Sequence, residues 1–399
     1  MMIFLGLGLW GYPLLAGLLL AAAGRRFPRS LRQRAAYFGF VIPLFSLLAA
    51  LLFNGHSLQL APEWWPGSGA IFFKFGFWGI AAAFWTTAIG LAWYEAEIRQ
   101  SPELPWWHEG LLLLVMTSAN AAFLSGNFLL RYASLEFAAL GIAIVQLLGS
   151  GTRSSQRLYL GFRLGDTGLL IAIILLIYAG ASLEIDQALE LAGSLPHAIL
   201  NWAAAGFALA VWVKTGAWPF VFWQNASRET HAPSISNWFL GSVMPNLGFY
   251  LLYRTAQLMH QTTTSLQTLI SIAAAVSALA ALFFVRAVPQ KKDQRLWLFT
   301  FQAAIAIFSA MIRLEVLIWV IMLSTSILRL PSINEIKTGI HNPNHENMIL
   351  LASGGLSALL ATVVVWAAPQ PSLNMFALWI MEACLALIIL WLIKPGGNP

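Results

Sequence analysis

The chain has few charged residues and almost no cysteine. Lys, Arg, Asp and Glu make up 10% of its 399 residues, and Cys384 is its only cysteine. A single cysteine excludes a disulfide within the chain and any metal site that needs two thiolates from it. An ordinary soluble domain has about 25% charged residues. The low charge therefore argues against a soluble protein of usual composition.

The sequence also lacks the motifs of the common enzyme classes. It has no glycine-rich loop that could hold a phosphate and no nucleophile with a plausible base nearby. His108 and Glu109 suggest a metal, but Glu95, Glu97 and Glu103 do not have metal-ligand spacing, and we expect this loop to be solvated. We therefore predict no catalytic residues, no cofactor and no metal site.

Long apolar segments occupy most of the chain instead. Hydrophobic residues make up 59% of it, and the mean hydropathy is +0.73. Because a hydrocarbon core needs about 20 apolar residues per helix, we predict an all-α, polytopic transmembrane helix bundle of about 13 spans. The predicted spans are 2–22, 34–54, 74–94, 109–125, 127–148, 158–182, 197–218, 234–255, 265–286, 295–312, 314–329, 348–368 and 374–394.

The positive net charge of +6 is better explained by membrane topology than by nucleic-acid binding. Basic residues are concentrated in the loops that follow odd-numbered spans, and the first of these loops holds Arg25, Arg26, Arg29, Arg32 and Arg34. Short cytoplasmic loops carry an excess of Lys and Arg. We therefore expect the N-terminus outside, the C-terminus in the cytoplasm, and no nucleic-acid partner.

One lysine lies inside the seventh apolar span. Lys214 has no carboxylate within one helical turn, and a charge so placed costs roughly 2.5 to 3.5 kcal/mol unless it faces a polar cavity or a partner. Pro219 should break the helix, because it removes a backbone donor and clashes with the preceding turn. A lysine beside a broken helix suggests an ion pathway. The alternative is a lysine that reaches to the membrane surface. Glu229 and His231 follow in a polar loop, where they are either solvated or take up protons.

Four more charges lie in the neighbouring spans. Glu136, in the fifth span, needs either a proton or a cation from another helix, and Lys214 is the expected partner. Local neutralisation by Arg131 is the alternative, although their spacing is not the favourable three or four residues. In the sixth span, Arg163 and Asp166 are three residues apart. We expect these two to form a structural ion pair with each other.

The fifth to eighth spans resemble a known family. Glu136, the sequence Arg163-Leu-Gly-Asp166 and the pattern Lys214-(x)₃-Trp-Pro219-(x)₃-Trp are similar to the antiporter-like subunits of respiratory complex I and of Mrp-type cation/proton antiporters. Relatives of this kind also include the membrane partner of inorganic-carbon uptake complexes. The resemblance implies that Glu136 and Lys214 pair and modulate proton movement in a half-channel.

The sequence departs from the family pattern in its C-terminal part. The uncharged Asn246 segment of the eighth span stands where the family commonly has a lysine or histidine. Arg295, at the start of the tenth span, lies in a segment that resembles the family's Asp-Ile-Lys segment. In the eleventh span the family's His-(x)₃-Lys pattern becomes Thr325-Ser-Ile-Leu-Arg329, and we add both arginines to the predicted proton pathway. The family's second broken helix is not visible. Two functions remain open, a proton-conducting subunit and a structural subunit with an inactive channel.

These observations divide the chain into three regions. They are N-terminal helices over 1–126, an antiporter-like core over 127–255 and divergent C-terminal helices over 256–399. The expected function is charge relay that couples proton movement to a partner reaction of a respiratory or inorganic-carbon uptake complex, without catalysis by the chain itself. The expected partners are the lipid bilayer, protons or other cations, and further subunits, in the inner membrane of a bacterium.

Overall fold

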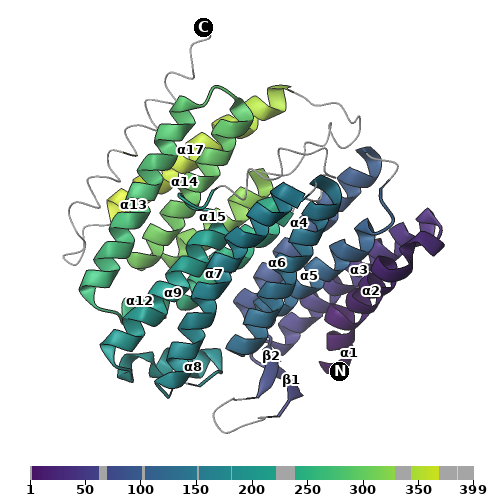
Figure 1. The fold of residues 1–399 in the computed structure, drawn as a ribbon, viewed down its shortest axis with the longest axis horizontal. Helices are drawn as coiled ribbons and strands as arrows, with labels where there is room; N and C mark the ends of the chain where they lie inside the picture. Colours follow the sequence, from purple (N-terminus) through teal and green to yellow (C-terminus); the bar gives the residue numbers. More distant parts are fainter. Residues whose placement is uncertain are drawn as a thin grey trace.

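The chain folds into a bundle of long helices that pack side by side, with the N-terminal helices at one side and the C-terminal helices at the other (Figure 1). The computed structural model describes residues 2–62, 70–100, 104–150, 152–180, 182–221, 239–328 and 343–367, together with Cys384. Each predicted span up to 348–368 corresponds to a helix, with shifted ends. The predicted span 374–394 lies, apart from Cys384, outside the described residues.

The helices of the N-terminal region and the core follow the expected order. The N-terminal region contains α1 (Met2–Gly6), η1 (Leu7–Gly11), α2 (Tyr12–Ala23), η2 (Gly24–Arg26), α3 (Arg29–Ala50), η3 (Leu51–Phe53), β1 (Ser57–Ala61), β2 (Ile71–Lys74), α4 (Phe77–Gln100) and α5 (His108–Leu124). The core contains α6 (Phe128–Ser150), α7 (Thr152–Tyr178), α8 (Ile185–Leu191), η4 (Ala192–Ser194), α9 (His197–Thr215), η5 (Phe239–Val243) and α12 (Met244–His260).

The C-terminal region adds four long helices. These are α13 (Thr264–Ala287), α14 (Lys291–Met311), α15 (Glu315–Leu328) and α17 (Pro343–Ala367). In Figure 1 they form the green and yellow side of the bundle, and α13 packs mainly on α14.

Six of the described helices are long and apolar enough to cross a membrane. They are Met2–Arg26, Arg29–Phe53, Phe128–Gly149, Ser155–Tyr178, His197–Thr215 and Thr264–Ala287. Large apolar side chains such as Phe4, Phe45 and Leu52 are exposed on the first helices, as expected of surfaces that face lipid. The all-α transmembrane class is therefore confirmed, and the total of thirteen spans stays a prediction.

A small β-hairpin was not predicted. β1 and β2 pair antiparallel, with Leu58 opposite Phe73, and Trp10 stacks on Phe73 at a centroid distance of 3.8 Å. The second strand occupies the start of the predicted span 74–94, so α4 begins at Phe77 instead. The hairpin lies at the same end of the bundle as α8 (Figure 1).

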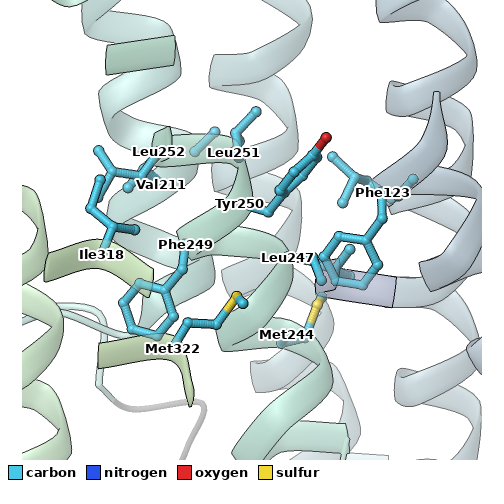
Figure 2. Close-up of a cluster of buried hydrophobic side chains, with 14 of the residues drawn as sticks. Phe123, Val211, Met244, Leu247, Phe249, Tyr250, Leu251, Leu252, Ile318 and Met322 are labelled. Carbon is cyan, nitrogen blue, oxygen red and sulfur yellow. The ribbon is translucent and has the colours of Figure 1, made fainter. Parts of the chain in front are cut away.

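The helix α12 passes through the middle of the hydrophobic core. Figure 2 shows Phe123 and Tyr250 on one side of α12 and Phe249 and Met322 on the other. Phe123 meets Tyr250 edge to face, with ring centroids 5.4 Å apart. Such aromatic pairs contribute beyond the area they bury. The packing fixes α12 against α5 and α15, and thereby fixes the polar side chains that α12 carries.

Candidate functional site

The predicted helix break beside Lys214 is confirmed. The helix α9 ends at Thr215, and Gly216 follows with a φ of 73°, a left-handed conformation that glycine adopts without a steric penalty. The indole Nε1 of Trp212 donates a hydrogen bond to the carbonyl of Trp218 at 2.9 Å and so ties the turn to the helix. The helix thus ends four residues before Pro219. Lys214 lies in its last turn, where a positive charge interacts favourably with the helix dipole.

Lys214 is buried and paired with Asp166 of α7. Its Nζ lies 2.5 Å from Asp166 Oδ1, and the two side chains are 0% and 1% exposed. The second carboxylate oxygen, Asp166 Oδ2, has no hydrogen-bond partner among the described residues. Removing two charges from water costs several kcal/mol per ion, and close contact only partly offsets it. A pair so placed is expensive in stability, as is common for functional charges in membranes.

A second ion pair lies beside the first. Arg163 Nη1 is 2.6 Å from Glu136 Oε2, with side chains 41% and 15% exposed. Arg163 also donates from Nε to the hydroxyl of Tyr159 at 2.7 Å, and its guanidinium lies 4.9 Å from the centre of that ring. Glu136 interacts electrostatically with both Asp166 and Lys214. Glu136, Arg163, Asp166 and Lys214 therefore form one group, called here the charge cluster.

The partners within the charge cluster differ from the predicted ones. We expected Glu136 with Lys214 and Arg163 with Asp166, but the structure pairs Arg163 with Glu136 and Asp166 with Lys214. The reason is that α7 packs on both α6 and α9, so its two charges each meet an opposite charge on a neighbouring helix. Asp166 was read as structural. Its position in the motif Arg163-Leu-Gly-Asp166 was the only sequence signal that could have identified it.

Glycines allow the helices of the cluster to approach closely. A Cβ atom at Gly165 would lie 2.9 Å from Val213 Cβ, and one at Gly168 would lie 2.9 Å from the Gly206 carbonyl oxygen. On the other side of α9, a Cβ at Gly248 would lie 2.8 Å from the backbone nitrogen of Thr215. Close backbone contact through small residues is common between membrane helices. Here it brings the end of α9 between α7 and α12.

Arg295 is the only one of the remaining predicted residues that the structure describes, and it lies outside the charge cluster. Arg295 is half-buried in the first turn of α14, which packs mainly on α13 and α17. Arg329, Glu229 and His231 lie outside the described residues. The roles of these four residues stay predictions.

The eighth-span segment without charge is part of a buried hydrogen-bonded chain. Asn246 Nδ2 donates to Thr86 Oγ1, and Ser326 Oγ donates to Asn246 Oδ1, both at 3.1 Å. Next to it, Thr87 Oγ1 donates to Asn120 Oδ1 at 3.1 Å. All five side chains are buried. The first set of bonds links α4, α12 and α15, and the second links α4 to α5. All of these amide and hydroxyl groups are uncharged at physiological pH.

Glu97, His108 and Glu109 are buried, so our expectation of a solvated loop was wrong for these three residues. His108 Nε2 lies 3.2 Å from Glu97 Oε2, and Arg32 Nε lies 3.6 Å from Glu109 Oε2. All four residues are buried or nearly so, because α5 already begins at His108 and packs there on α3 and α4. Among the described residues no group of three or more His, Cys, Asp or Glu could hold a metal ion.

Comparison with known proteins supports the resemblance seen in the sequence. Residues 125–290 match the transmembrane family described as NADH:quinone oxidoreductase/Mrp antiporter, and this segment contains the whole charge cluster. No curated protein sequence matches the chain.

The fold is similar to that of chains in large membrane complexes. A chain of the Mrp complex from Dietzia sp. DQ12-45-1b superposes with a TM-score of 0.76 and 17% identity, covering 100% of this chain and 81% of that one. A chain of the archaeal membrane-bound sulfane sulfur reductase gives 0.75 and 14%, covering 98% and 86%. A chain of respiratory complex I from Thermus thermophilus gives 0.69 and 19%, covering 99% and 89%. At these identities the likeness concerns the fold.

Proposed function

We propose that this chain relays protons through Lys214 and the charge cluster. The premise is that it is an antiporter-like integral membrane subunit, which the family of its central region and its fold support. One observation carries the proposal. A fully buried lysine at the end of an interrupted membrane helix contacts an equally buried aspartate at 2.5 Å. In a membrane interior, ionisable residues of this kind commonly belong to proton relays.

The chemistry follows from the environment of the amine. While Lys214 contacts Asp166, the carboxylate stabilises the ammonium form. When that contact opens, burial favours the neutral amine, because a lysine that loses its counter-charge in a low-dielectric site releases its proton readily. The helix ends at Thr215, one residue after Lys214, where the Gly216 N–H donates to the Val213 carbonyl and closes the last turn.

Glu136 and Arg163 supply the means of opening the contact. Glu136 Oε1 has no hydrogen-bond partner among the described residues, and Glu136 is already in electrostatic range of Lys214. If Glu136 moves to Lys214, Asp166 and Arg163 remain three residues apart on α7 and can pair. Both arrangements contain two ion pairs. We propose that protons advance as the charge cluster exchanges between them, a two-state element of the kind that ligands and partners can bias.

We further propose that the chain works inside a larger membrane complex. Its similarity to chains of multi-subunit membrane complexes supports other subunits as partners. A respiratory complex or an inorganic-carbon uptake complex would supply the coupled reaction. The proposed location is the bacterial inner membrane with the N-terminus outside. The orientation is based on the five arginines within residues 25–34, because arginine is in excess on the cytoplasmic side.

Proton flux into liposomes tests the relay. The wild-type protein, alone and with any co-purifying subunits, would be reconstituted and compared with Lys214→Ala, Asp166→Asn and Lys214→Arg. We expect each variant to lose flux, and Lys214→Arg to lose it because a guanidinium does not release its proton in the physiological range. Arg286→Gln, which changes an exposed arginine of α13, is the matched control. Full flux in Lys214→Ala would refute the proposal.

A structural subunit with an inactive channel is the second candidate. The observation in its favour is the uncharged hydrogen-bonded chain at Asn246, where the resemblance leads one to expect a lysine or histidine. In that case the wild-type complex would show no more flux than Lys214→Ala, while both would retain all subunits. Flux in the wild type that disappears in the variant, with assembly unchanged, favours the relay.

A further inference from the structure

A charged cavity lies at the β-hairpin end of the bundle. It has a volume of about 360 Å³ and is bordered by residues from β2, α8 and the ends of α4, α5, α6, α12 and α15. Its charged lining consists of Lys74, Arg131, Asp186, Glu190, Arg254 and Glu315. The residues of the charge cluster do not line it, so it is a separate feature of the molecule.

Arg131 is the most deeply buried charge of this cavity. The residue is only 3% exposed. Two of its nitrogens donate to backbone carbonyls, Nε to Ala122 at 3.2 Å and Nη2 to Ser125 at 2.9 Å. Its guanidinium lies 5.3 Å from the centre of the Tyr250 ring. The remaining nitrogen, Nη1, has no hydrogen-bond partner among the described residues. A buried guanidinium normally has a carboxylate or another anion as partner.

The charges nearest Arg131 leave an excess of positive charge. Asp186 pairs with both Lys74 and Arg254 at once, so one carboxylate serves two cations. The Nε of Arg254 is also buried without a partner. Arg131 interacts with Arg254 and Asp186, and therefore joins this group. Three cations and one carboxylate give these four residues a formal charge of +2.

The other two carboxylates that line the cavity, Glu190 and Glu315, are not ion-pair partners of Arg131 or Arg254. Glu190 is exposed, where water and salt screen its charge, and Glu315 is half-buried at the first residue of α15. In the structure neither forms an ion pair with Arg131 or Arg254; the carboxylate that pairs with Arg254 is Asp186. Arg131 and Arg254 both line the cavity, together with Tyr250 and Trp78, and each arginine has one buried nitrogen without a hydrogen-bond partner among the described residues.

We propose that this cavity binds a compact oxyanion, a phosphate or carboxylate group, between Arg131 and Arg254. The planar guanidinium groups match such an anion in geometry as well as charge. The group belongs either to a free solute or to the headgroup of an anionic lipid. The proposal is independent of the proton relay, because it needs only the cavity and its arginines.

Binding of defined anions to the purified protein tests this inference. The protein would be placed in nanodiscs of phosphatidylcholine, and phosphate and acetate would be titrated by calorimetry and by the fluorescence of tryptophans such as Trp78, at an ionic strength held constant with a bulky sulfonate. We expect saturable binding of at least one anion to the wild type. Arg254→Gln should weaken it by about tenfold or more, the effect of losing a hydrogen bond to a charged group.

A matched set of variants makes the outcome decisive. Arg131→Gln should abolish binding, and Arg286→Gln should bind as the wild type does. Because Arg131 also binds the carbonyls at the end of α5, its variant is interpreted only with an unchanged melting temperature, and Arg254→Gln and Arg254→Lys test the site without that contact. Equal binding in the wild type and Arg254→Gln, or no binding of either anion, would overturn the inference unless the lipid arm is positive.

The lipid arm distinguishes the two sources of the anion. Nanodiscs that contain phosphatidylglycerol should suppress phosphate binding if a headgroup occupies the cavity, and the wild-type protein should then retain more of this lipid through purification than Arg254→Gln retains. Unchanged phosphate binding in these nanodiscs assigns the site to a free solute. If phosphate, acetate and phosphatidylglycerol all behave identically with the wild type and Arg254→Gln, the cavity is not an anion site.

Discussion

At the scale of single residues, the energetics of the charge cluster depend on burial. Lys214 and Asp166 are almost completely buried, whereas Arg163 retains access to solvent. Breaking a buried pair by removing one partner typically costs about 3 to 5 kcal/mol, because the other charge is left without compensation. Replacing both partners by apolar residues is often neutral. The two pairs of the cluster should therefore differ in their response to mutation.

A double-mutant cycle on Lys214 and Asp166 measures this difference. Lys214→Met and Asp166→Leu should each lower the melting temperature in nanodiscs, whereas the double variant should be close to the wild type. For comparison, Arg163→Met should have a smaller effect, because its half-exposed pair gains little net energy. Additive losses in the double variant would mean that the two side chains do not interact as the structure indicates.

The lowered pKa of Asp186 leads to a second prediction, which concerns stability as a function of pH. Burial alone would raise its pKa, but the hydrogen bond from Lys74 and the charge and hydrogen bond of Arg254 together hold the pKa below its ordinary value. Glu184 shows the opposite shift, because burial and the charge of Asp186 raise its pKa. A depressed carboxylate pKa stabilises the folded state above the unfolded pKa, and this contribution is lost as pH falls through the folded pKa.

Thermal unfolding as a function of pH checks the assignment. Between neutral and strongly acidic pH, the wild type should lose more stability than Asp186→Asn, which cannot ionise at this position. At neutral pH the variant should be the less stable of the two. Glu190→Gln, at an exposed position of α8 about one helical turn after Asp186, serves as the control. Parallel pH curves for the wild type and Asp186→Asn would contradict the prediction.

The sequence could reveal which residues matter here but not which ones touch. Lys214 was identifiable because a lone charge in an apolar helix needs a partner, and the break near Pro219 followed from backbone chemistry. The choice of Asp166 over Glu136 depends on how closely α7 and α9 approach and on which face of α7 meets α6. Those distances come from packing over the whole bundle. Arg131 was likewise visible only as a neighbour of Glu136, because its cavity is formed by residues far apart in sequence.

At the scale of elements, the contact of α7 with α9 controls the geometry of the charge cluster. A Cβ atom at Gly206 would lie 2.5 Å from the Gly168 carbonyl oxygen and 3.1 Å from Ala172 Cβ, so even the smallest side chain would push the helices apart. Overpacking of this kind typically costs about 1 to 3 kcal/mol. The displacement would also lengthen the distance between Lys214 and Asp166.

Gly206→Ala tests this contact. We expect a lower melting temperature and reduced proton flux, since Lys214 lies two turns further along α9 and moves with it. Gly355→Ala, at a helical glycine of α17 with open space around its Cα, should change neither property. If Gly206→Ala keeps full stability, the helices are less tightly packed than described here.

Elements that depend on distant contacts were not predictable from the chain alone. The long helices were evident from apolar runs of the length needed to cross a membrane. The hairpin of β1 and β2 was missed because its strands are short and its packing partner, Trp10, lies far away in sequence. For the same reason α5 was expected to start in solvent, although its first residues His108 and Glu109 are covered by α3 and α4.

At the scale of the whole molecule, orientation in the membrane follows from the basic loops. The arginines between residues 25 and 34 lie around the junction of the first two spans, whereas His56 lies at the opposite end of α3, next to the hairpin. The excess of arginine at one end predicts that this end faces the cytoplasm. On this prediction, the hairpin, α8 and the cavity of Arg131 would face outward.

Cysteine labelling in intact cells tests the orientation. Starting from a Cys384→Ser background, His56→Cys should react with a membrane-impermeant maleimide added outside, and Arg26→Cys should react only after permeabilisation. Both positions are exposed, so access to the reagent depends on the side of the membrane. The reverse labelling pattern would place the N-terminus in the cytoplasm.

The hydrogen-bonded chain through Asn246 has a mechanical consequence. Asn246 is bonded to both Thr86 and Ser326, so α4, α12 and α15 are joined where α12 begins and α15 ends, and we expect them to resist sliding past one another. The helices α6 and α7 are joined to each other by the ion pair of Glu136 and Arg163, which can exchange its partners. If the charge cluster exchanges its partners as proposed, a movement of α7 would reach α12 through α9, which packs on both. We expect the hydrogen-bonded helices to move together and to transmit the displacement to any subunit that contacts α4 or α15.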